Sequence, residues 1–265
     1  MIEAKQESFW KLVDRGAEVK KVLGGFRFTE GPVFSRRGFL LFTDIPANRI
    51  IKWQKGNDSK WTQSVLRENS NSANGLTFDH QGRLLACETG RVTRTEKDGA
   101  ITVLADGVKG PNDLVYCIDG GTYFTDYPAG KVYLIPRKGT ARVVAEGDKP
   151  NGVALSPDQM QLYVGDSGKR LIRVYGVAAS GDLTNGRDFC SARCDGLKTD
   201  EGGNVWITSG GGVRVYDKQG GELGFIGTPE EPSNCCWGEG FRGLYITAGT
   251  SVYHVATRSN GTRTY

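Results

Sequence analysis

The chain has 265 residues, of which 38% are hydrophobic, 24% are charged and 38 are glycines. The 34 basic and 30 acidic residues leave a net charge of +4 that is spread along the chain, which excludes the concentrated basic surface of a nucleic-acid-binding protein. No run of about 18 consecutive apolar residues occurs, so the sequence also excludes a membrane-spanning helix.

The N-terminal residues lack the apolar core and cleavage site of a secretory signal. We therefore expect a cytoplasmic protein whose six cysteines are free thiols, mostly buried as small apolar side chains. The spacing of Cys190 and Cys194 and the presence of two histidines disfavour a Cys/His metal site. Residues 8–16 are expected to form a short helix.

From residue 30 onward, one pattern recurs six times. Each unit begins with an oxygen-bearing polar residue and continues with a short apolar strand, a turn and a second apolar strand. The first residues of the six units are Glu30, Asn74, Asn112, Asn151, Asp195 and Asn234. They lie 44, 38, 39, 44 and 39 residues apart, a period that is typical of propellers and other repeat folds.

Further strand-like runs follow in most units, such as residues 131–135 and 141–145 in the third. These runs are short, β-branched and aromatic, and glycine-containing turns separate them. Four strands in roughly 40 residues is the length of one propeller blade. The sequence therefore predicts an all-β fold, a six-bladed β-propeller with four-stranded antiparallel blades around a central channel, in a single domain spanning residues 1–265.

The last unit is too short to supply four strands. An open row of blades would leave apolar faces in water, so the ring has to close. We expect residues 17–23, within the N-terminal segment 1–29, to form the missing outer strand of the last blade.

The six polar residues that begin the units have two interpretations. Asn-Gly and Asp-Gly pairs are common in turns, and turns before each strand explain three of the units without any function. Alternatively, equivalent positions of the innermost strands face one another around the channel axis and form a site. Glu30, which is a poor turn former, and Asn234, which precedes a cysteine, favour the second interpretation, but both stay open at this point.

If these residues form a site, their chemistry selects its occupant. Two carboxylates and several amide oxygens suit a hard divalent cation, with Ca²⁺ favoured and Mg²⁺ or Mn²⁺ as alternatives. Zn²⁺ usually selects His or Cys, although it also binds carboxylates.

The same residues resemble a known family. The segments that carry the resemblance are Glu30-Gly-Pro-Val, Ala73-Asn-Gly-Leu, Pro111-Asn-Asp-Leu, Pro150-Asn-Gly-Val-Ala-Leu, Cys194-Asp-Gly-Leu-Lys-Thr-Asp and Asn234-Cys-Cys-Trp. In this order and at this spacing, they resemble the senescence marker protein / gluconolactonase / luciferin-regenerating enzyme family of six-bladed propellers. Members of that family are mostly lactonases that act on sugar or other small lactones, and some hydrolyse organophosphates.

The resemblance implies a divalent cation, commonly Ca²⁺, deep in the channel. Its ligands would be Glu30, Asn151 and Asp195, with Asn112 as a fourth ligand or as a residue that holds water and substrate. Asp195 would be the general base that activates water, although direct attack by Asp195 as a nucleophile remains an alternative. Asn74 would complete the ring of polar side chains on the substrate side.

Residues other than the six that begin the units are assigned by their positions in the blades. Tyr127 and Arg91 are expected at the mouth of the channel, where they would contact the small-molecule lactone. Asp44, Asp126 and Asp166 end equivalent second strands and are expected to be structural or to steer the site residues. Two other functions stay open: an organophosphate or other ester hydrolase on the same cation, and a protein-interaction propeller without enzymatic activity.

Overall fold

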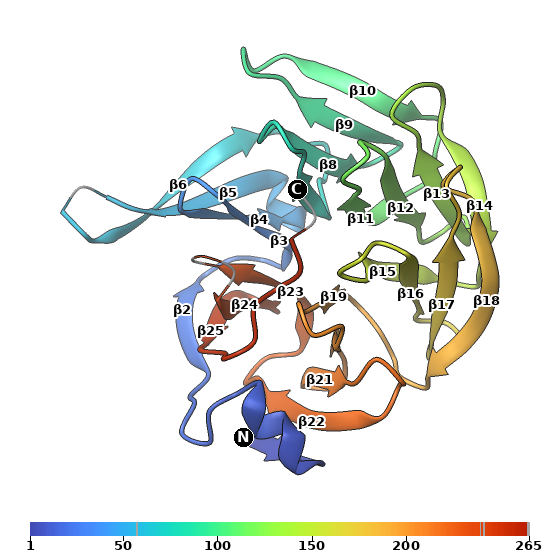
Figure 1. The fold of residues 1–265 in the computed structure, drawn as a ribbon. Coiled ribbons are helices and arrows are strands. Elements are labelled where there is room, and N and C mark those ends of the chain that lie inside the picture. The colour runs from blue at the N-terminus through green and yellow to red at the C-terminus, as the bar shows by residue number, and fades with distance from the viewer. Residues whose placement is uncertain (57, 239, 241, 264–265) are drawn as a thin grey trace.

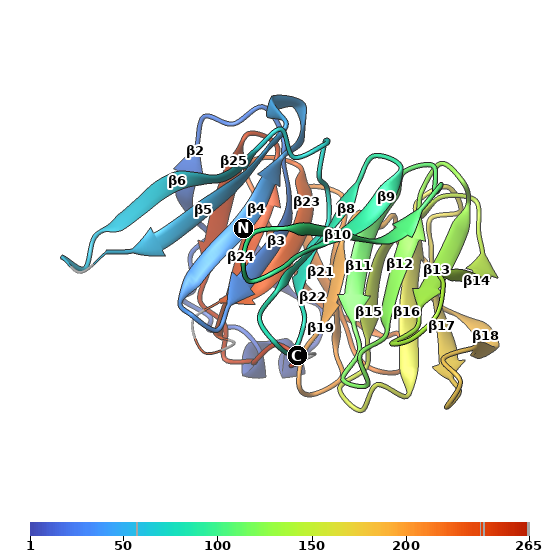
Figure 2. The same cartoon turned by 90° about the horizontal axis from the view of Figure 1, so that it is seen from above.

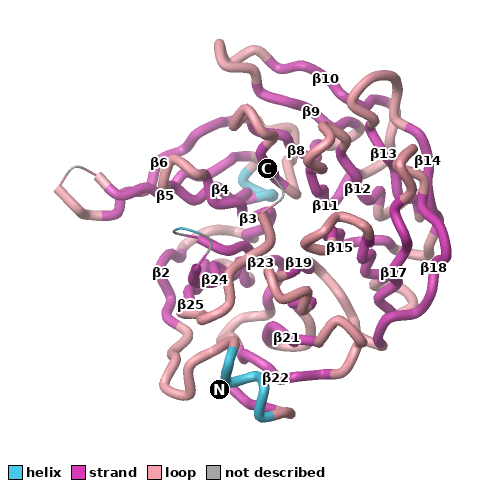
Figure 3. Tube along the Cα trace, in the orientation of Figure 1, coloured by secondary structure: helices cyan, strands magenta, loops and turns pink. Residues whose placement is uncertain are grey.

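The computed structural model describes residues 1–56, 58–238, 240 and 242–263, and over these residues the strands form six sheets arranged in a ring (Figure 1). Helix is confined to two short 3₁₀ segments in the described part of the chain (Figure 3). The predicted all-β six-bladed propeller is confirmed.

Four blades run from the inside of the ring to the outside in chain order. The first comprises β3 (Thr29–Ser35), β4 (Phe39–Asp44), β5 (Arg49–Lys55) and β6 (Trp61–Glu68). The second comprises β7 (Leu76–Phe78), β8 (Leu84–Glu88), β9 (Arg91–Thr95) and β10 (Ile101–Asp106). The third comprises β11 (Pro111–Tyr116), β12 (Thr122–Asp126), β13 (Lys131–Ile135) and β14 (Arg142–Glu146). The fourth comprises β15 (Pro150–Leu155), β16 (Gln161–Asp166), β17 (Leu171–Val177) and β18 (Leu183–Cys190).

The last two blades each take an outer strand from the N-terminal segment. The fifth comprises β19 (Leu197–Thr199), β20 (Val205–Thr208), β21 (Gly212–Tyr216), β22 (Glu222–Gly227) and, outermost, β1 (Ile2–Ala4). The sixth comprises β23 (Pro232–Gly238), β24 (Arg242–Ala248), β25 (Ser251–Val255) and, outermost, β2 (Lys20–Gly24). Neighbouring strands pair antiparallel in both sheets.

The N-terminal segment ties the two ends of the chain together. Strand β2 pairs with β25, so that Lys20 faces His254 across the ladder, whereas the sequence placed this outer strand at residues 17–23. Strand β1, which pairs with β22, was not predicted. In place of the expected helix over residues 8–16, the structure has the 3₁₀ helix η1 (Glu7–Lys11), whose Phe9 is fully buried.

The hydrophobic core lies between the blades. Among the described residues, the buried apolar side chains form six clusters, and each cluster combines residues from two neighbouring blades. Between the fifth and sixth blades, for example, the rings of Trp206 and Trp237 meet edge to face with centroids 5.3 Å apart. Because each blade needs a neighbour on both sides to bury its faces, ring closure is required for stability.

All six cysteines are free, as expected, and five of them are buried. Within the described residues, the helices are too short and too polar to cross a membrane.

The innermost strand of each blade lines the channel. These six strands are β3, β7, β11, β15, β19 and β23. Their first residues lie at one end of the ring, which we call the entry end. At the opposite end, the C-terminal segment crosses the channel, and the Thr262 backbone N–H donates to the Thr199 carbonyl at 3.0 Å (Figure 2). A cavity of about 90 Å³ lies inside this end, between apolar side chains such as Val115 and Leu155.

Candidate active site in the central channel

Bulges at the start of the inner strands direct polar side chains to the channel. The pairing between the first and second strands of a blade is interrupted between Glu30 and Val33, between Pro111 and Leu114, and between Pro150 and Val153. A bulge breaks the regular alternation of a strand and turns side chains out of the sheet, which is why bulges recur beside active sites. Three of the repeated polar residues, Glu30, Asn112 and Asn151, lie at these interruptions.

The glycines that follow three of the polar residues are explained by close approach of the blades. A Cβ atom on Gly75 would lie 2.6 Å from the Asn112 carbonyl oxygen of the next blade, and one on Gly152 would lie 2.7 Å from the Asp195 carbonyl oxygen. A Cβ on Gly196 would overlap the side chain of Asn234. None of the three glycines has a left-handed backbone, so the narrow channel, not turn formation, requires glycine here.

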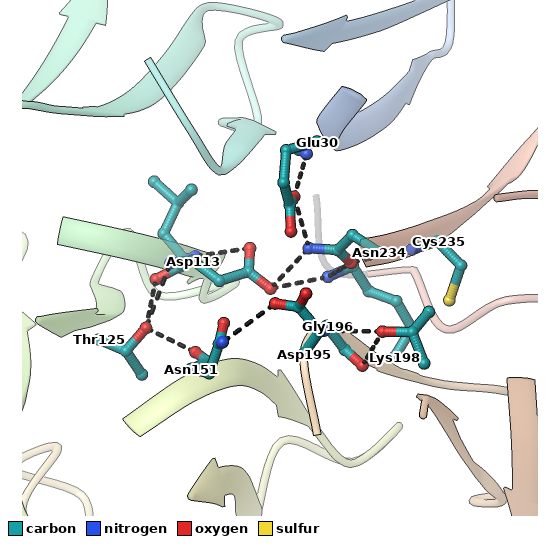
Figure 4. A network of polar contacts seen from close by, with 12 residues as sticks. Glu30, Asp113, Thr125, Asn151, Asp195, Gly196, Lys198, Asn234 and Cys235 are labelled. Carbon is teal, nitrogen blue, oxygen red and sulfur yellow. Dashed lines mark hydrogen bonds and ion pairs between the residues drawn. The ribbon is translucent and has the colours of Figure 1, made fainter. Parts of the chain in front are cut away.

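Side chains from four blades meet in one hydrogen-bonded network (Figure 4). The Asn234 Nδ2 group donates to Glu30 Oε2 and to Asp113 Oδ2, both at 3.2 Å. The Lys198 ammonium donates to Asp113 Oδ2 and to Asn234 Oδ1, both at 3.3 Å. The backbone N–H of Cys235 donates to the same Asn234 oxygen at 2.9 Å, so two donors fix the orientation of this amide.

Asn151 and Asp195 form a second part of the site, from the fourth and fifth blades. Asn151 Nδ2 donates to Asp195 Oδ1 at 3.0 Å and to Ser167 Oγ at 3.2 Å. The Ser167 hydroxyl itself donates to the Cys194 carbonyl, so it accepts from Asn151 and sets the orientation of the amide. The Asn151 Oδ1 atom is therefore left facing the channel.

Two amide oxygens of the repeated polar residues are buried without a hydrogen-bond partner among the described residues. They are Asn151 Oδ1 and Asn74 Oδ1. An unpaired buried oxygen costs about 1–3 kcal/mol, so folded proteins rarely keep one without a ligand or water to fill it. These atoms are the donors that a bound cation would use.

Burial and neighbouring charges raise the proton affinity of Glu30 and Asp195. Glu30 and Asp113 are 3% and 2% exposed, whereas Asp195 is half-buried. Burial raises the pKa of Glu30 well above its ordinary value, and the nearby charges of Asp195 and Asp113 raise it further. Burial also raises the pKa of Asp195 to about 6, against the opposing hydrogen bond from Asn151. Carboxylates that are crowded in this way gain from a neighbouring cation.

The donor set fits a hard divalent cation. Among the described residues, no three His, Cys, Asp or Glu side chains form a metal-binding group, so a cation site here has to combine carboxylate and amide oxygens. Glu30, Asp195 and the unpartnered oxygen of Asn151, which are labelled in Figure 4, supply such a set, and the unpartnered oxygen of Asn74 is a further candidate. All-oxygen donors are the preference of Ca²⁺.

The structure brings together most of the six polar residues that begin the units. Glu30, Asn151, Asp195 and Asn234 all take part in the contacts above. The sequence named Asn112 in the third blade, whereas the side chain that joins the network is that of the next residue, Asp113. Asn112 is half-buried, and its side chain takes no part in the network. The bulge between Pro111 and Leu114 explains the difference, because a shift of one residue exchanges the two faces of a strand.

Tyr127 lies in the turn after β12, and Arg91 is the first residue of β9. The Arg91 guanidinium pairs with Glu88 at 2.9 Å, and Glu88 also binds Arg67 at 2.7 Å. The Lys149 ammonium lies 5.8 Å from the centre of the Tyr127 ring. Contact of either residue with substrate stays a prediction.

Sequence reasoning missed Asp113, Lys198 and Ser167. Lys198 had a detectable signal, because it is the fourth residue of its unit and the other units carry uncharged residues there. Those residues are Val33, Thr77, Val115, Ala154 and Trp237. A charge at an otherwise apolar or small position of a channel strand marks a special role. Ser167 follows Asp166 without any distinguishing pattern.

The geometry agrees with comparisons to known proteins. Residues 28–250 match the family model described as SMP-30/Gluconolactonase/LRE-like region. The chain belongs to this family. It is 30% identical to a gluconolactonase of Zymomonas mobilis over 94% of this chain and 84% of the relative. It is 27% identical to a pentonolactonase of Haloferax volcanii over 83% of this chain and 81% of the relative.

A solved structure supports the same assignment. A gluconolactonase from Xanthomonas campestris superimposes with a TM-score of 0.88 at 29% identity, covering 97% of this chain and 94% of that one. The family match therefore extends over the whole ring of blades.

Proposed function

We propose that the protein opens a small lactone of the sugar-lactone class at the entry end of the channel, as a lactonase-type hydrolase. The gluconolactonase and pentonolactonase relatives, which match most of the chain, support this activity. The observation that carries the proposal is the convergence of carboxylates from three blades with the unpartnered oxygen of Asn151 in the channel.

The cation would be held by Glu30, Asn151 and Asp195, with Asn74 as a further oxygen donor and Asn112 near the substrate. Ca²⁺ suits this set best, and Mg²⁺, Mn²⁺ and Zn²⁺ are the alternatives. When bound, a divalent cation supplies Lewis-acid polarisation of the lactone carbonyl group.

Asp195 would act as the general base. It is the most exposed of the three carboxylates, and its Oδ1 atom is oriented by Asn151. Asp195 takes a proton from water as the water oxygen bonds to the carbonyl carbon. The ring C–O bond then breaks, and the same proton passes to the ring oxygen, so the product is the open-chain hydroxy acid and Asp195 is regenerated.

A substrate panel tests the activity. Gluconolactone, galactonolactone, a homoserine lactone and an aryl phosphotriester would be compared by pH-stat or chromophore release, before and after EDTA and after Ca²⁺ is restored. We expect the sugar lactones to react fastest, with loss in EDTA and recovery with Ca²⁺. Failure to open any lactone with any of the four cations would overturn the proposal.

A further inference from the structure

Lys198 holds an unusual position in the channel. It lies on β19, and its side chain lines the apolar cavity beneath the polar network. Its ammonium group nevertheless reaches the network, where it contacts Asp113 of the third blade and Asn234 of the sixth. The side chain therefore bridges three blades across the channel.

The charges of the network balance only if Lys198 is included. Three carboxylates act on one another here, those of Glu30, Asp113 and Asp195. Among the described residues, Lys198 is the positively charged side chain bonded to this network. When the three carboxylates are all ionised, as ligands of a bound cation are, Lys198 brings the charge of the site from −3 to −2. Arg193 and Glu231 also act on Asp195, but they are exposed and of opposite sign, so their effects offset.

We propose that Lys198 is a built-in counter-ion that neutralises Asp113 and limits the channel to one divalent cation. The inference rests on the proposed function, since it concerns the same cation site. Asp113 Oδ2 already accepts from both Lys198 and Asn234, so this oxygen is not offered to a second ion. A net charge of −2 then matches a single divalent cation.

The contact with Lys198 also determines which end of the Asn234 amide faces the carboxylates. The Asn234 oxygen accepts from Lys198 and from Cys235, so only its Nδ2 group faces the carboxylates of Glu30 and Asp113. Asn234 therefore acts as a hydrogen-bond donor to the carboxylates, not as an oxygen ligand of the cation.

Cation titration of variants tests the proposal with a readout other than activity. Calorimetry on EDTA-treated, dialysed protein would measure the stoichiometry for Ca²⁺ and the ratio of Tb³⁺ to Ca²⁺ affinity. Lys198→Met keeps the stem but removes the charge, leaving a site charge of −3. We expect a second Ca²⁺ equivalent or a rise of at least about tenfold in the Tb³⁺ to Ca²⁺ ratio, because a trivalent ion gains more from an added negative charge.

Three further variants separate charge from packing. Lys198→Arg keeps the charge, and Asp113→Asn combined with Lys198→Met restores −2, so both are expected to bind one Ca²⁺ with the wild-type ratio. The exposed Lys218→Met, distant in sequence from the network, is the matched control and is expected to behave as wild type. An unchanged stoichiometry and ratio in Lys198→Met would overturn the inference.

A single charge-removing variant covers the case in which Lys198→Met does not fold. Asp113→Asn leaves Lys198 uncompensated and the site at −1, so Ca²⁺ affinity is expected to fall at least about tenfold. Unchanged affinity in this variant would also overturn the role of Lys198. If the wild-type protein binds no divalent cation at all, the proposed cation site itself is wrong, an outcome that is distinct from a failure of the Lys198 inference alone.

Discussion

Two groups of buried carboxylates in this protein differ in what surrounds them. The first group, which we call the turn carboxylates, is Asp44, Asp126 and Asp166, at the ends of the second strands. Asp126 accepts backbone N–H groups of Lys109 and Gly110 at 2.8 and 3.0 Å, from the loop that leads into β11. Asp44 holds the loop before β3 in the same way. Each turn carboxylate therefore positions the loop before a strand that carries a channel residue.

Asp166 shows how fully backbone hydrogen bonds can surround a turn carboxylate. Its carboxylate accepts four backbone N–H groups, those of residues 148, 149, 168 and 169. Burial raises the pKa of Asp166, but these hydrogen bonds outweigh burial and bring the pKa below its ordinary value. The group is therefore stable as an anion without any ligand.

The second group, the channel carboxylates, is Glu30, Asp113 and Asp195. These groups face one another, and the donors from other side chains are the Lys198 ammonium and the amides of Asn234 and Asn151. Burial and mutual repulsion raise the pKa of Glu30 instead of lowering it. A carboxylate that four backbone N–H groups enclose therefore has a lowered pKa, as in Asp166, whereas Glu30, with fewer donors and with carboxylates as neighbours, has a raised one.

The largest expected effect is a loss of activity, which should occur when a channel carboxylate is replaced but not when a turn carboxylate is replaced. Asp195→Asn should lower kcat by about 10³-fold, because the general base is lost, while its thermal midpoint measured in EDTA stays close to that of the wild type in EDTA. Asp166→Asn is the matched variant and should keep its activity per folded molecule. Steady-state kinetics beside a thermal melt measures both, and normal turnover by Asp195→Asn would remove it from the mechanism.

Removal of the cation should lower the stability of the protein, and this effect should depend on the channel carboxylates and not on the turn carboxylates. EDTA is expected to lower stability by about 2.7 kcal/mol relative to a Ca²⁺ concentration one hundred times its Kd. For a chain of this size, that is a fall in the melting temperature of about 5 °C or more. Glu30→Gln should abolish most of the EDTA effect, whereas Asp126→Asn should retain it. An EDTA effect of equal size in both variants would break the comparison.

Removing a turn carboxylate should cost stability in place of activity. Asp166→Asn keeps one acceptor oxygen but loses the charge that strengthens four backbone hydrogen bonds, so unfolding free energy should fall by about 2 kcal/mol. Urea denaturation of the wild type and the variant measures this difference. An unchanged midpoint together with lost activity would place Asp166 in the catalytic machinery.

The smallest expected effect is a pH dependence of stability that arises from Glu230, a carboxylate beside the sixth blade. Glu230 accepts from the Thr250 backbone N–H and hydroxyl and from the Tyr253 hydroxyl at 2.7–2.9 Å. Burial raises its pKa, but hydrogen bonds to the carboxylate outweigh burial and lower the pKa to about 2.

Because this pKa is lower in the folded state, the stabilisation from Glu230 is present above about pH 4.5 and is lost as pH falls towards 2. Glu230→Gln should be less stable than wild type at pH 7 by about 1–2 kcal/mol, and the difference should vanish near pH 2. Denaturant titrations at several pH values measure it. A difference that stayed constant with pH would show that the charge of Glu230 is not involved.

Repeat spacing was sufficient to predict the ring and the level at which its polar residues meet. Equal spacing places equivalent residues at equal heights, so Glu30, Asn151 and Asp195 could be grouped although they are far apart in the chain. The same reasoning did not identify Asp113, which lies next to Asn112 at a bulge and joins the network, because spacing does not show how a bulge orients adjacent side chains.

Lys198 escaped prediction for a different reason. Its long side chain leaves one blade and bonds to two others, and such a reach depends on the width of the channel, which periodicity does not encode. Strand β1 was missed because three residues paired to an outer edge carry no periodic signal.

Anomalous diffraction from a Mn²⁺-soaked crystal tests the central claim most directly, since it locates the ion and its donors together. We expect one strong peak in the channel, bonded to the carboxylates of Glu30 and Asp195 and to Asn151 Oδ1, with Lys198 still paired to Asp113. A channel without a peak, or an ion bound by other residues, would contradict the account.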